Sequence, residues 1–523
     1  MPSLLHNLVL DRREDTATAL VDKKRSVSYA DLAERIDTAA RGFVAARLGR
    51  RERVAVYLPK SIETVVALFA ATRAGGVMVP VNPVLRAPQV RHILEDAGAT
   101  ILVTSRDRYT GLRDALEGID CLKAIVITDG PVGDHVGPVP VIDWDALDGK
   151  ASLLAKSIDA DVAALLYTSG STGRPKGVVL SHRNIVAGAE SVATYLENGP
   201  EDRILAVLPL SFDAGFSQLT TAFHSGATAV LHDYFLPRDL LRLAEREGIT
   251  GITAVPPLWS QLAELDWPDS CRKSLRYFAN TGGKMPKALL ARLRETFPSA
   301  APYLMYGLTE AFRSTYLPPF EVDNRPDSIG KAIPNAEILV VRPDGTECND
   351  DEPGELVHRG ALVSLGYWAD PARTAERFKP APGQPDGVPL TEIAVWSGDT
   401  VRRDADGFLY FIGRKDDMIK TSGYRVSPTD IEEAAFASGL VTEAAAIGIE
   451  DQRLGQRIVL VAATGAPGEP PTDGVLQHFR NALPNFMVPA EVHWQASLPR
   501  NPNGKIDRGA VRSMLAEQDR EAS

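Results

Sequence analysis

Short apolar runs typical of strands alternate with helical patterns along the first half of the chain, and this alternation constrains the fold most. The runs 54–58, 76–81 and 101–104 read as buried strands, and residues 62–74 between the first two read as a helix. The same pattern returns later in the chain, in strands 204–208, 227–231 and 252–255 and in a helix over 240–247. Strands that alternate with helices predict a doubly wound α/β fold with a largely parallel sheet.

A different pattern begins near residue 338. Short strands over residues 338–366 are broken at Asp344-Gly345 and Pro353-Gly354, and such dipeptides favour tight turns. We therefore expect a small β-rich subdomain with a structural role. The Pro- and Gly-rich stretch 379–389 reads as a surface loop.

A loop rich in glycine and hydroxyl groups stands out within this framework. Residues 165–177 read LLYTSGSTGRPKG, so an apolar strand leads into a loop that ends in Lys176. Glycine allows close backbone approach to an anion, while hydroxyls, N–H groups and one lysine supply donors and charge. The segment is not a Walker loop, because Gly177 follows the lysine where Ser or Thr would be needed. A flexible linker is the alternative, which the apolar runs on both sides disfavour.

Composition limits the classes of function. A chain of 523 residues with 44% hydrophobic and 24% charged residues should form at least two domains. The net charge of −11 argues against a nucleic-acid partner. The cysteines, Cys121, Cys271 and Cys348, form no CxxC pair, which fits a reducing compartment. With no apolar run of membrane-spanning length and no signal peptide in the sequence, we expect a cytoplasmic protein without a membrane partner. Its oligomeric state stays open.

The glycine-rich loop resembles the phosphate-binding signature of the adenylate-forming enzymes: acyl-CoA synthetases, nonribosomal peptide adenylation domains and luciferases. Further motifs similar to that family follow in the family's order, at residues 74–80, 306–310, 397–399, 413–417 and 502–508. Residues 306–317 are also similar to an AMP-forming acyl-CoA ligase subgroup associated with exosortase systems. The resemblance implies a large N-terminal adenylate-forming domain (1–413), a hinge (414–417) and a small, mobile α+β C-terminal domain (418–523).

The resemblance also implies a reaction with ATP and Mg²⁺. A carboxylic acid would be activated as acyl-AMP with release of pyrophosphate, then transferred to the thiol of CoA or of a carrier-protein phosphopantetheine. Lys505 matches the lysine that brings the two anions together, Thr309 the hydroxyl that contacts the α-phosphate, and Glu310 the acid that binds Mg²⁺. The residues that match nucleotide-binding positions are Thr168, Ser169, Gly170, Ser171, Thr172, Gly173, Lys176, Gly282, Gly283, Tyr306, Gly307, Asp399, Arg414 and Arg425.

Within this set, Tyr306 would stack on adenine, Asp399 would accept the ribose hydroxyls, and Arg414 would donate to the ribose. Asp416 would be the pivot of the hinge, with an ordinary charged turn as the alternative. Gly423 would line the tunnel for the thiol arm, with a plain β-turn as the alternative.

Three residues are implied in substrate choice: Asp213, Arg313 and Gly282. Asp213 follows Phe212, as in the amino-acid-activating branch of the family, where the acid pairs with the substrate ammonium group. Capping of the following helix is the other interpretation of Asp213. Because a buried arginine is costly unless paired, Arg313 should face either Asp213 or an anionic group of the substrate.

Two other functions remain open at this point. The enzyme could pass its acyl-AMP to a nitrogen nucleophile instead of a thiol. The chain could also be a nucleotide-binding regulator that has lost catalysis, although Lys505, Glu310 and the complete phosphate loop argue against this.

Overall fold

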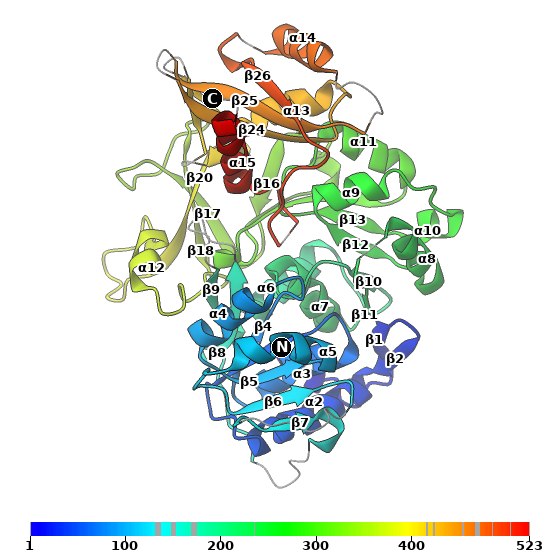
Figure 1. Ribbon diagram of the computed structural model, residues 1–523. Helices are drawn as coiled ribbons and strands as arrows, with labels where there is room; N and C mark the ends of the chain where they lie inside the picture. Colours follow the sequence, from blue (N-terminus) through cyan, green and yellow to red (C-terminus); the bar gives the residue numbers. More distant parts are fainter. Residues whose placement is uncertain are drawn as a thin grey trace.

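The computed structural model describes residues 2–130, 138–147, 153–168, 175–234, 236–414, 417–421, 424–451, 454–465, 471–483, 485–502 and 504–521. Figure 1 shows the N-terminal residues at the bottom of the molecule, the middle of the chain above them and the C-terminal residues at the top. Among the described helices, none has the length and apolar character needed to cross a membrane.

The lower part of the molecule is built on a mainly parallel sheet. All neighbouring strands in it run parallel except the last pair, and its order is β7 (Val141–Asp143), β6 (Ala124–Ile127), β5 (Ala99–Thr104), β3 (Arg53–Tyr57), β4 (Val77–Pro80), β8 (Val162–Thr168) and β9 (Lys176–Ser181). The connecting helices include α3 (Ile62–Arg73), α4 (Ala87–Ala97) and α5 (Arg106–Leu116), while α2 (Tyr29–Ala45) packs against α3. The strands expected at 54–58, 76–81 and 101–104 are thus confirmed to within a few residues.

A second, longer sheet begins parallel and ends antiparallel. Its parallel strands are, in order, β1 (Thr18–Asp22), β11 (Thr228–Leu231), β10 (Arg203–Ala206), β12 (Gly251–Ala254), β13 (Tyr277–Asn280) and β14 (Ala301–Tyr306), with β2 (Arg25–Ser28) antiparallel at the edge beside β1. The helices of this region are α1 (Asn7–Leu10), α6 (His182–Tyr195), α7 (Asp213–Ser225), α8 (Pro237–Glu247), α9 (Pro256–Leu262), α10 (Asp269–Ser274) and α11 (Lys287–Thr296). One continuous apolar cluster joins the two sheets into a common core.

The antiparallel continuation is the expected β-rich part, and it is larger than the sequence indicated. Beyond β14 follow β15 (Thr315–Leu317), β16 (Ser328–Ala332), β21 (Leu409–Arg414), β20 (Ile393–Arg403), β18 (Gly354–Gly360) and β17 (Ala336–Val341). The short strand β19 (Phe378–Pro380) pairs with β20 after α12 (Pro371–Arg377), so the expected loop at 379–389 begins as a strand. Strands 393–403 and 409–414 enlarge this region because they return to pair with β18 and β16.

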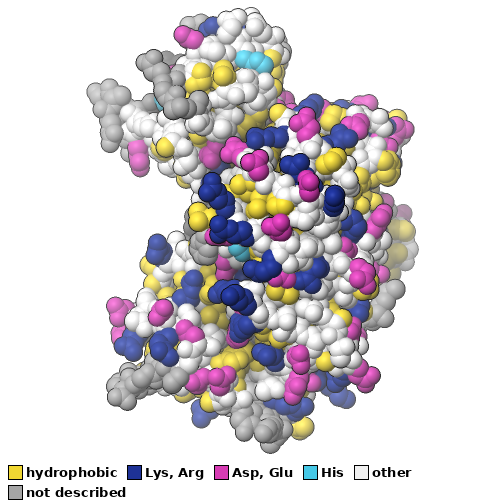
Figure 2. All heavy atoms as spheres, turned by 90° about the vertical axis from the view of Figure 1, so that its right-hand side faces the viewer, with side chains coloured by type: hydrophobic (Ala, Val, Ile, Leu, Met, Phe, Trp, Pro, Cys, Tyr) yellow, Lys and Arg dark blue, Asp and Glu magenta, His cyan; other side chains and the backbone are white. Residues whose placement is uncertain are grey.

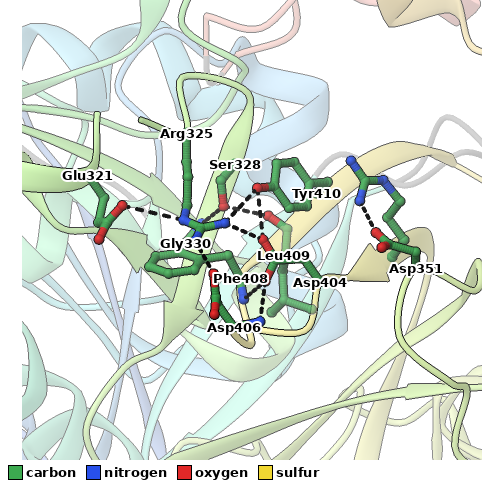
Figure 3. A network of polar contacts seen from close by, with 11 residues as sticks. Glu321, Arg325, Ser328, Gly330, Asp351, Asp404, Asp406, Phe408, Leu409 and Tyr410 are labelled. Carbon is green, nitrogen blue, oxygen red and sulfur yellow. Dashed lines mark hydrogen bonds and ion pairs between the residues drawn. The ribbon is translucent and has the colours of Figure 1, made fainter. Parts of the chain in front are cut away.

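A cluster of charged side chains anchors the turn before β21. Arg325 contacts Asp404 and Asp406 and lies 4.3 Å from the centroid of the Phe408 ring, as Figure 3 shows. Ser328 on β16 donates to the carbonyl of Leu409, at 2.8 Å. The base of the strand that ends at Arg414 is therefore fixed to its neighbour.

The C-terminal residues have cores of their own. Their sheet contains β23 (Tyr424–Val426), β22 (Ile419–Thr421), β25 (Gly455–Ala463), β24 (Glu443–Asp451) and β26 (Glu491–Trp494). Its helices are α13 (Pro428–Ala437), α14 (Thr472–Ala482) and α15 (Arg508–Glu521). Two apolar clusters drawn wholly from residues 419–515 involve α13 and α14 in one case and α15 in the other. The chain is thus an α/β protein with a large N-terminal and a small α+β C-terminal domain; the expected limits 1–413 and 418–523 stay predictions.

The surface charge is unevenly distributed. Figure 2 shows acidic and basic side chains interspersed over one face, with Lys and Arg side chains gathered at mid-height along one edge. The net charge of −11 is therefore compatible with local basic regions on this protein.

A buried histidine makes the stability of the N-terminal region depend on pH. The Nδ1 atom of His182, which is 1% exposed, accepts a hydrogen bond from the backbone N–H of Leu5, at 3.0 Å. Burial lowers the pKa of His182 to about 4, against the opposing charges of Asp161 and Asp159. Only the neutral ring can accept this bond at Nδ1.

Since the pKa of His182 is lower in the folded state, the unfolded chain binds more protons below pH 6.5, and stability falls with pH in that window. We expect this residue alone to remove about 2 kcal/mol of unfolding free energy between pH 7 and pH 5. In His182→Asn, an amide oxygen replaces Nδ1 without titrating, so the variant should lose less stability over this range. Urea unfolding at both pH values measures the difference; equal losses in the two proteins would contradict the assignment.

Candidate active site

The candidate residues gather where the parallel strands of the second sheet end. Asp213 lies in the connection that follows β10, Gly282 and Gly283 follow β13, and Tyr306 is the last residue of β14. In open α/β sheets, ligands bind outside the carboxyl ends of the strands, where the strand order reverses. The order reverses beside β10, which has β11 on one side and β12 on the other. The topology therefore places a site at this edge.

Lys505 reaches this edge from the C-terminal domain. Its backbone N–H donates to the side chain of Asn501, at 3.1 Å, and Gly504 has a φ of +79°, so a tight turn presents the lysine. Figure 1 shows the segment before α15 reaching down from the C-terminal sheet toward the centre of the molecule. Asn82 holds the turn there, because its amide donates to the carbonyl of Pro502 at 3.0 Å.

The Lys505 side chain passes close to Gly282. A Cβ atom at Gly282, which has a φ of +77°, would lie 3.1 Å from Cε of Lys505, so both space and backbone conformation favour glycine. The ammonium lies 5.7 Å from the centroid of the Phe212 ring. Burial lowers the pKa of Lys505, and the neighbouring Asp213 carboxylate opposes that shift.

Asp213 and Arg313 face each other. Nη1 of Arg313 lies 3.3 Å from Oδ2 of Asp213, and both side chains are almost completely buried. The hydroxyl of Thr309 donates to the other oxygen, Oδ1, at 3.4 Å. Burial raises the pKa of Asp213, while the charges of Arg313 and Lys505 oppose the rise.

Of the two interpretations of Arg313, the structure shows the contact with Asp213. It does not support capping by Asp213: the residue is the first of α7, the cap position is Phe212, and no side-chain cap bond is made there. Nε of Arg313 is buried without a partner among the described residues. This leaves the guanidinium with a donor to offer.

A strained backbone turn aims Arg313 into the site. Phe312 has a φ of +59° and a ψ of −56°, and the N–H of Arg313 donates to the carbonyl of Ala311 at 2.6 Å. This is the rare γ-turn with positive φ, which costs free energy for a residue with a side chain. Gly188 accommodates it, since a Cβ there would lie 2.4 Å from the Phe312 ring.

Lys176 and Glu310 meet on the opposite side of the motif that contains Arg313. Nζ of Lys176 lies 3.4 Å from Oε1 of Glu310, and the hydroxyl of Tyr367 lies between them. Lys176 begins β9 and is the register partner of Thr168 on β8, so strands flank the glycine-rich loop as expected. Ser169, Gly170, Ser171, Thr172 and Gly173 lie outside the described residues.

Asp399 is engaged on both oxygens. Tyr306 donates its hydroxyl to Oδ2, and Nε of Arg414 donates to Oδ1 at 2.9 Å. The three residues predicted to hold the base and ribose of a nucleotide are thus in direct contact. The Tyr306 ring also lies 6.2 Å from that of Phe411.

Gly307 lies against the backbone of Arg313, where a Cβ would approach Cα of that residue to 3.0 Å. The hinge residue Asp416 and the tunnel residue Gly423 fall outside the described residues, as does the side chain of Arg425. Their roles stay predictions.

The sequence analysis missed three residues that connect these groups: Asn82, Lys284 and Tyr367. Asn82 follows strand β4 directly, a position where polar residues at a sheet edge could have been suspected. A lone lysine after Gly283 and a lone tyrosine after Gly366 give no comparable signal.

Glu310 offers a donor set that fits Mg²⁺. Both of its side-chain partners contact Oε1, so Oε2 has no side-chain partner among the described residues. Mg²⁺ is usually held by one or two carboxylates together with substrate phosphates and water. One buried carboxylate with an available oxygen matches that pattern.

Comparison with known proteins establishes the family. The model of the AMP-binding enzyme family matches residues 10–368, and the model of the AMP-binding enzyme C-terminal domain matches residues 430–505. The chain therefore belongs to the AMP-binding enzymes, an ATP-binding, adenylate-forming family, as its motifs indicated.

Several relatives cover nearly the whole chain. Feruloyl-CoA synthase from an Amycolatopsis species is 30% identical over 510 residues, 96% of both chains. The L-proline–[L-prolyl-carrier protein] ligase of Pseudomonas fluorescens is 30% identical over 518 residues, 97% of both. A linear gramicidin synthase of Brevibacillus parabrevis is 31% identical over 505 residues, 95% of this chain and 6% of that protein. The chain spans 10% of a second linear gramicidin synthase from the same organism, so it covers a small part of these two synthases.

A solved structure agrees with the fold over almost its full length. O-succinylbenzoate coenzyme A synthetase from Bacillus subtilis, in complex with ATP and magnesium ion, superposes with a TM-score of 0.80 at 27% identity. The match covers 97% of this chain and 99% of that one.

Proposed function

We propose that this protein activates a small carboxylic acid with ATP and transfers the acyl group to a thiol of CoA or of a carrier-protein phosphopantetheine. The carboxylate attacks the α-phosphorus of ATP, pyrophosphate leaves, and acyl-AMP forms. The thiol then attacks the acyl carbon, and AMP departs with one carboxylate oxygen. The observation that carries the proposal is the position of Lys505, which the C-terminal turn delivers beside Asp213 and Gly282.

The roles of the residues follow from charge. Two anions must meet in the first step, so a cation held between them lowers its barrier. Lys505 supplies that cation, and Thr309 offers a hydroxyl nearby. Glu310 would hold Mg²⁺, which neutralises phosphate charge when it is bound. Tyr306, Asp399 and Arg414 would hold the adenosine.

The substrate acid is proposed to carry a second polar group. Asp213 and Arg313 form a buried pair joined by a single 3.3 Å contact, and Nε of Arg313 is left unpartnered. An amino or imino group can donate to Asp213, and an anionic group can accept from Arg313. A relative named for L-proline supports the first choice, whereas one named for feruloyl-CoA shows that this family also includes enzymes named for acids without an amino group.

Exchange of labelled pyrophosphate into ATP tests the proposal. The exchange requires an acid that forms an acyl-AMP, so a panel of aliphatic, aromatic and amino acids identifies the substrate class. Thiol-dependent loss of the acyl-AMP then distinguishes CoA or a carrier protein from a nitrogen nucleophile. A protein that binds ATP but supports no exchange with any member of the panel would favour the regulator instead.

We also propose that the C-terminal domain changes pose between the two steps, about a hinge within 414–417. In this structure Lys284 ties the domains together. Its Nζ lies 2.7 Å from Oε1 of Glu433 on α13 and 3.6 Å from Oδ1 of Asp327. This link, like the Asn82 contact, belongs to the pose that presents Lys505.

Removing that link should therefore affect the two steps unequally. A partly exposed ion pair contributes up to about 1 kcal/mol, so Lys284→Ala should slow acyl-AMP formation by up to about fivefold. Conversion of supplied acyl-AMP to thioester should not fall. Lys287→Ala is the matched control, because Lys287 contacts the same Asp327, at 2.8 Å, without reaching Glu433. Equal effects of Lys284→Ala on both half-reactions would contradict a pose-specific link.

A further inference from the structure

Tyr367 connects the two charged groups on the phosphate side of the site. Its hydroxyl donates to Oε1 of Glu310 at 2.6 Å and accepts from Nζ of Lys176 at 2.8 Å. The same ammonium lies 4.0 Å from the centroid of the tyrosine ring. Tyr367 is 5% exposed, so these contacts are shielded from water.

The backbone around Tyr367 is fastened to the elements that carry both partners. Residues 364–368 run beside β9, the strand that begins with Lys176, and also reach the backbone of Glu310. The hydrogen bonds are Leu365 N–H to Val179 O at 2.8 Å, Val179 N–H to Gly366 O at 2.9 Å, Trp368 N–H to Gly177 O at 2.8 Å, and Ser364 N–H to Glu310 O at 2.9 Å. The hydroxyl is thus held at a fixed distance from the lysine strand and from the acid.

The tyrosine ring is also fixed from behind. It packs edge-on against Phe378, with ring centroids 5.6 Å apart and an interplanar angle of 86°. The N–H of Tyr367 donates to Oγ1 of Thr374 on α12, at 3.0 Å. Little rotational freedom remains to the hydroxyl.

The charges keep this hydroxyl a donor. Burial and the adjacent Glu310 carboxylate raise the pKa of Tyr367 far above its ordinary value, so the phenol stays protonated. Burial raises the pKa of Glu310, but the Lys176 charge and the Tyr367 hydrogen bond outweigh it, and the pKa is lowered overall. Glu310 is therefore ionised and accepts from Tyr367.

We propose that Tyr367 is a positioning residue that holds the ionised Glu310 by Oε1, so that Oε2 stays available to a magnesium ion when Lys176 turns to the phosphates of a nucleotide. The inference rests on the proposed function. Lys176 and Glu310 neutralise each other in this structure. Once the lysine contacts phosphate instead, Tyr367 is the side chain that still orients the carboxylate.

The test is Tyr367→Phe, which removes the hydroxyl and keeps the ring on Phe378. The melting temperature is measured with ATP in EDTA and then over a range of Mg²⁺ concentrations. We expect the Mg²⁺ concentration for half of the metal-dependent stabilisation to rise about tenfold to a hundredfold, as for the loss of one hydrogen bond to a charged group. The KM for ATP should rise when Mg²⁺ is limiting, and kcat should recover at high Mg²⁺.

Tyr29→Phe is the matched control. It removes a buried tyrosine hydroxyl that donates to Ala227 O, at 2.7 Å, in a region remote from Glu310. Tyr29→Phe should lower the melting temperature without ligand and leave the Mg²⁺ dependence unchanged. Wild-type Mg²⁺ dependence in Tyr367→Phe would overturn the inference alone. A wild-type protein that neither gains stability with ATP and Mg²⁺ nor supports pyrophosphate exchange would overturn the proposed function, and this inference with it.

Discussion

Replacing Lys505 by alanine should slow acyl-AMP formation by about a hundredfold or more and leave thioester formation from supplied acyl-AMP largely intact. Loss of one positioned charge in an electrostatic site typically costs roughly 3 kcal/mol of transition-state stabilisation. The lysine belongs to a C-terminal turn that docks through Asn82, so its effect should be confined to the pose with that contact.

Lys505→Arg provides a sharper version of this experiment. It preserves the charge, but the side chain passes close to Gly282, where even a methyl group would lie 3.1 Å from Cε of Lys505. We expect this larger guanidinium to restore little activity. Pyrophosphate exchange and single-turnover thioester formation, measured on the same preparations, separate the two steps. An equal loss in both half-reactions would refute the role of Lys505.

The second large effect concerns the buried pair of Asp213 and Arg313. Arg313→Met leaves the Asp213 carboxylate buried without its partner, and breaking a buried pair in this way costs about 3–5 kcal/mol. Urea unfolding of both single variants and of Asp213→Asn combined with Arg313→Met measures the coupling. The double variant should be less destabilised than the sum of the single ones.

The same variants distinguish a structural pair from a substrate site. If Asp213 also accepts from an amino group, Asp213→Asn should raise the KM for an amino-bearing acid about tenfold to a hundredfold, since a hydrogen bond to a charged group contributes roughly 1.5–3 kcal/mol. An unsubstituted acid should be affected much less. Equal KM changes for both acids would show that the pair serves stability only.

The sequence predicted the fold and the identity of most candidate residues because these depend on local patterns. Alternating apolar strands and helices define the sheets, and the motifs resembling the family indicated Lys505, Glu310 and Asp399. The β-rich part was underestimated because β20 and β21 pair with strands far away in the sequence, and no local signal reports such pairing.

The contacts between candidate residues were harder to predict. The approach of Arg313 to Asp213 depends on a γ-turn at Phe312, a conformation that phenylalanine rarely adopts. Tyr367 takes its place from hydrogen bonds between residues 364–368 and β9, which are distant in the chain. Such contacts follow from tertiary packing and not from composition or spacing.

Transfer of oxygen from the acid to AMP tests the central claim most directly. With an acid labelled with ¹⁸O in both carboxylate oxygens, ATP and a thiol acceptor, we expect mass spectrometry to find one labelled oxygen in AMP and none in pyrophosphate. That result requires the carboxylate to attack the α-phosphorus. Unlabelled AMP, or label in an inorganic phosphate product, would contradict activation through acyl-AMP.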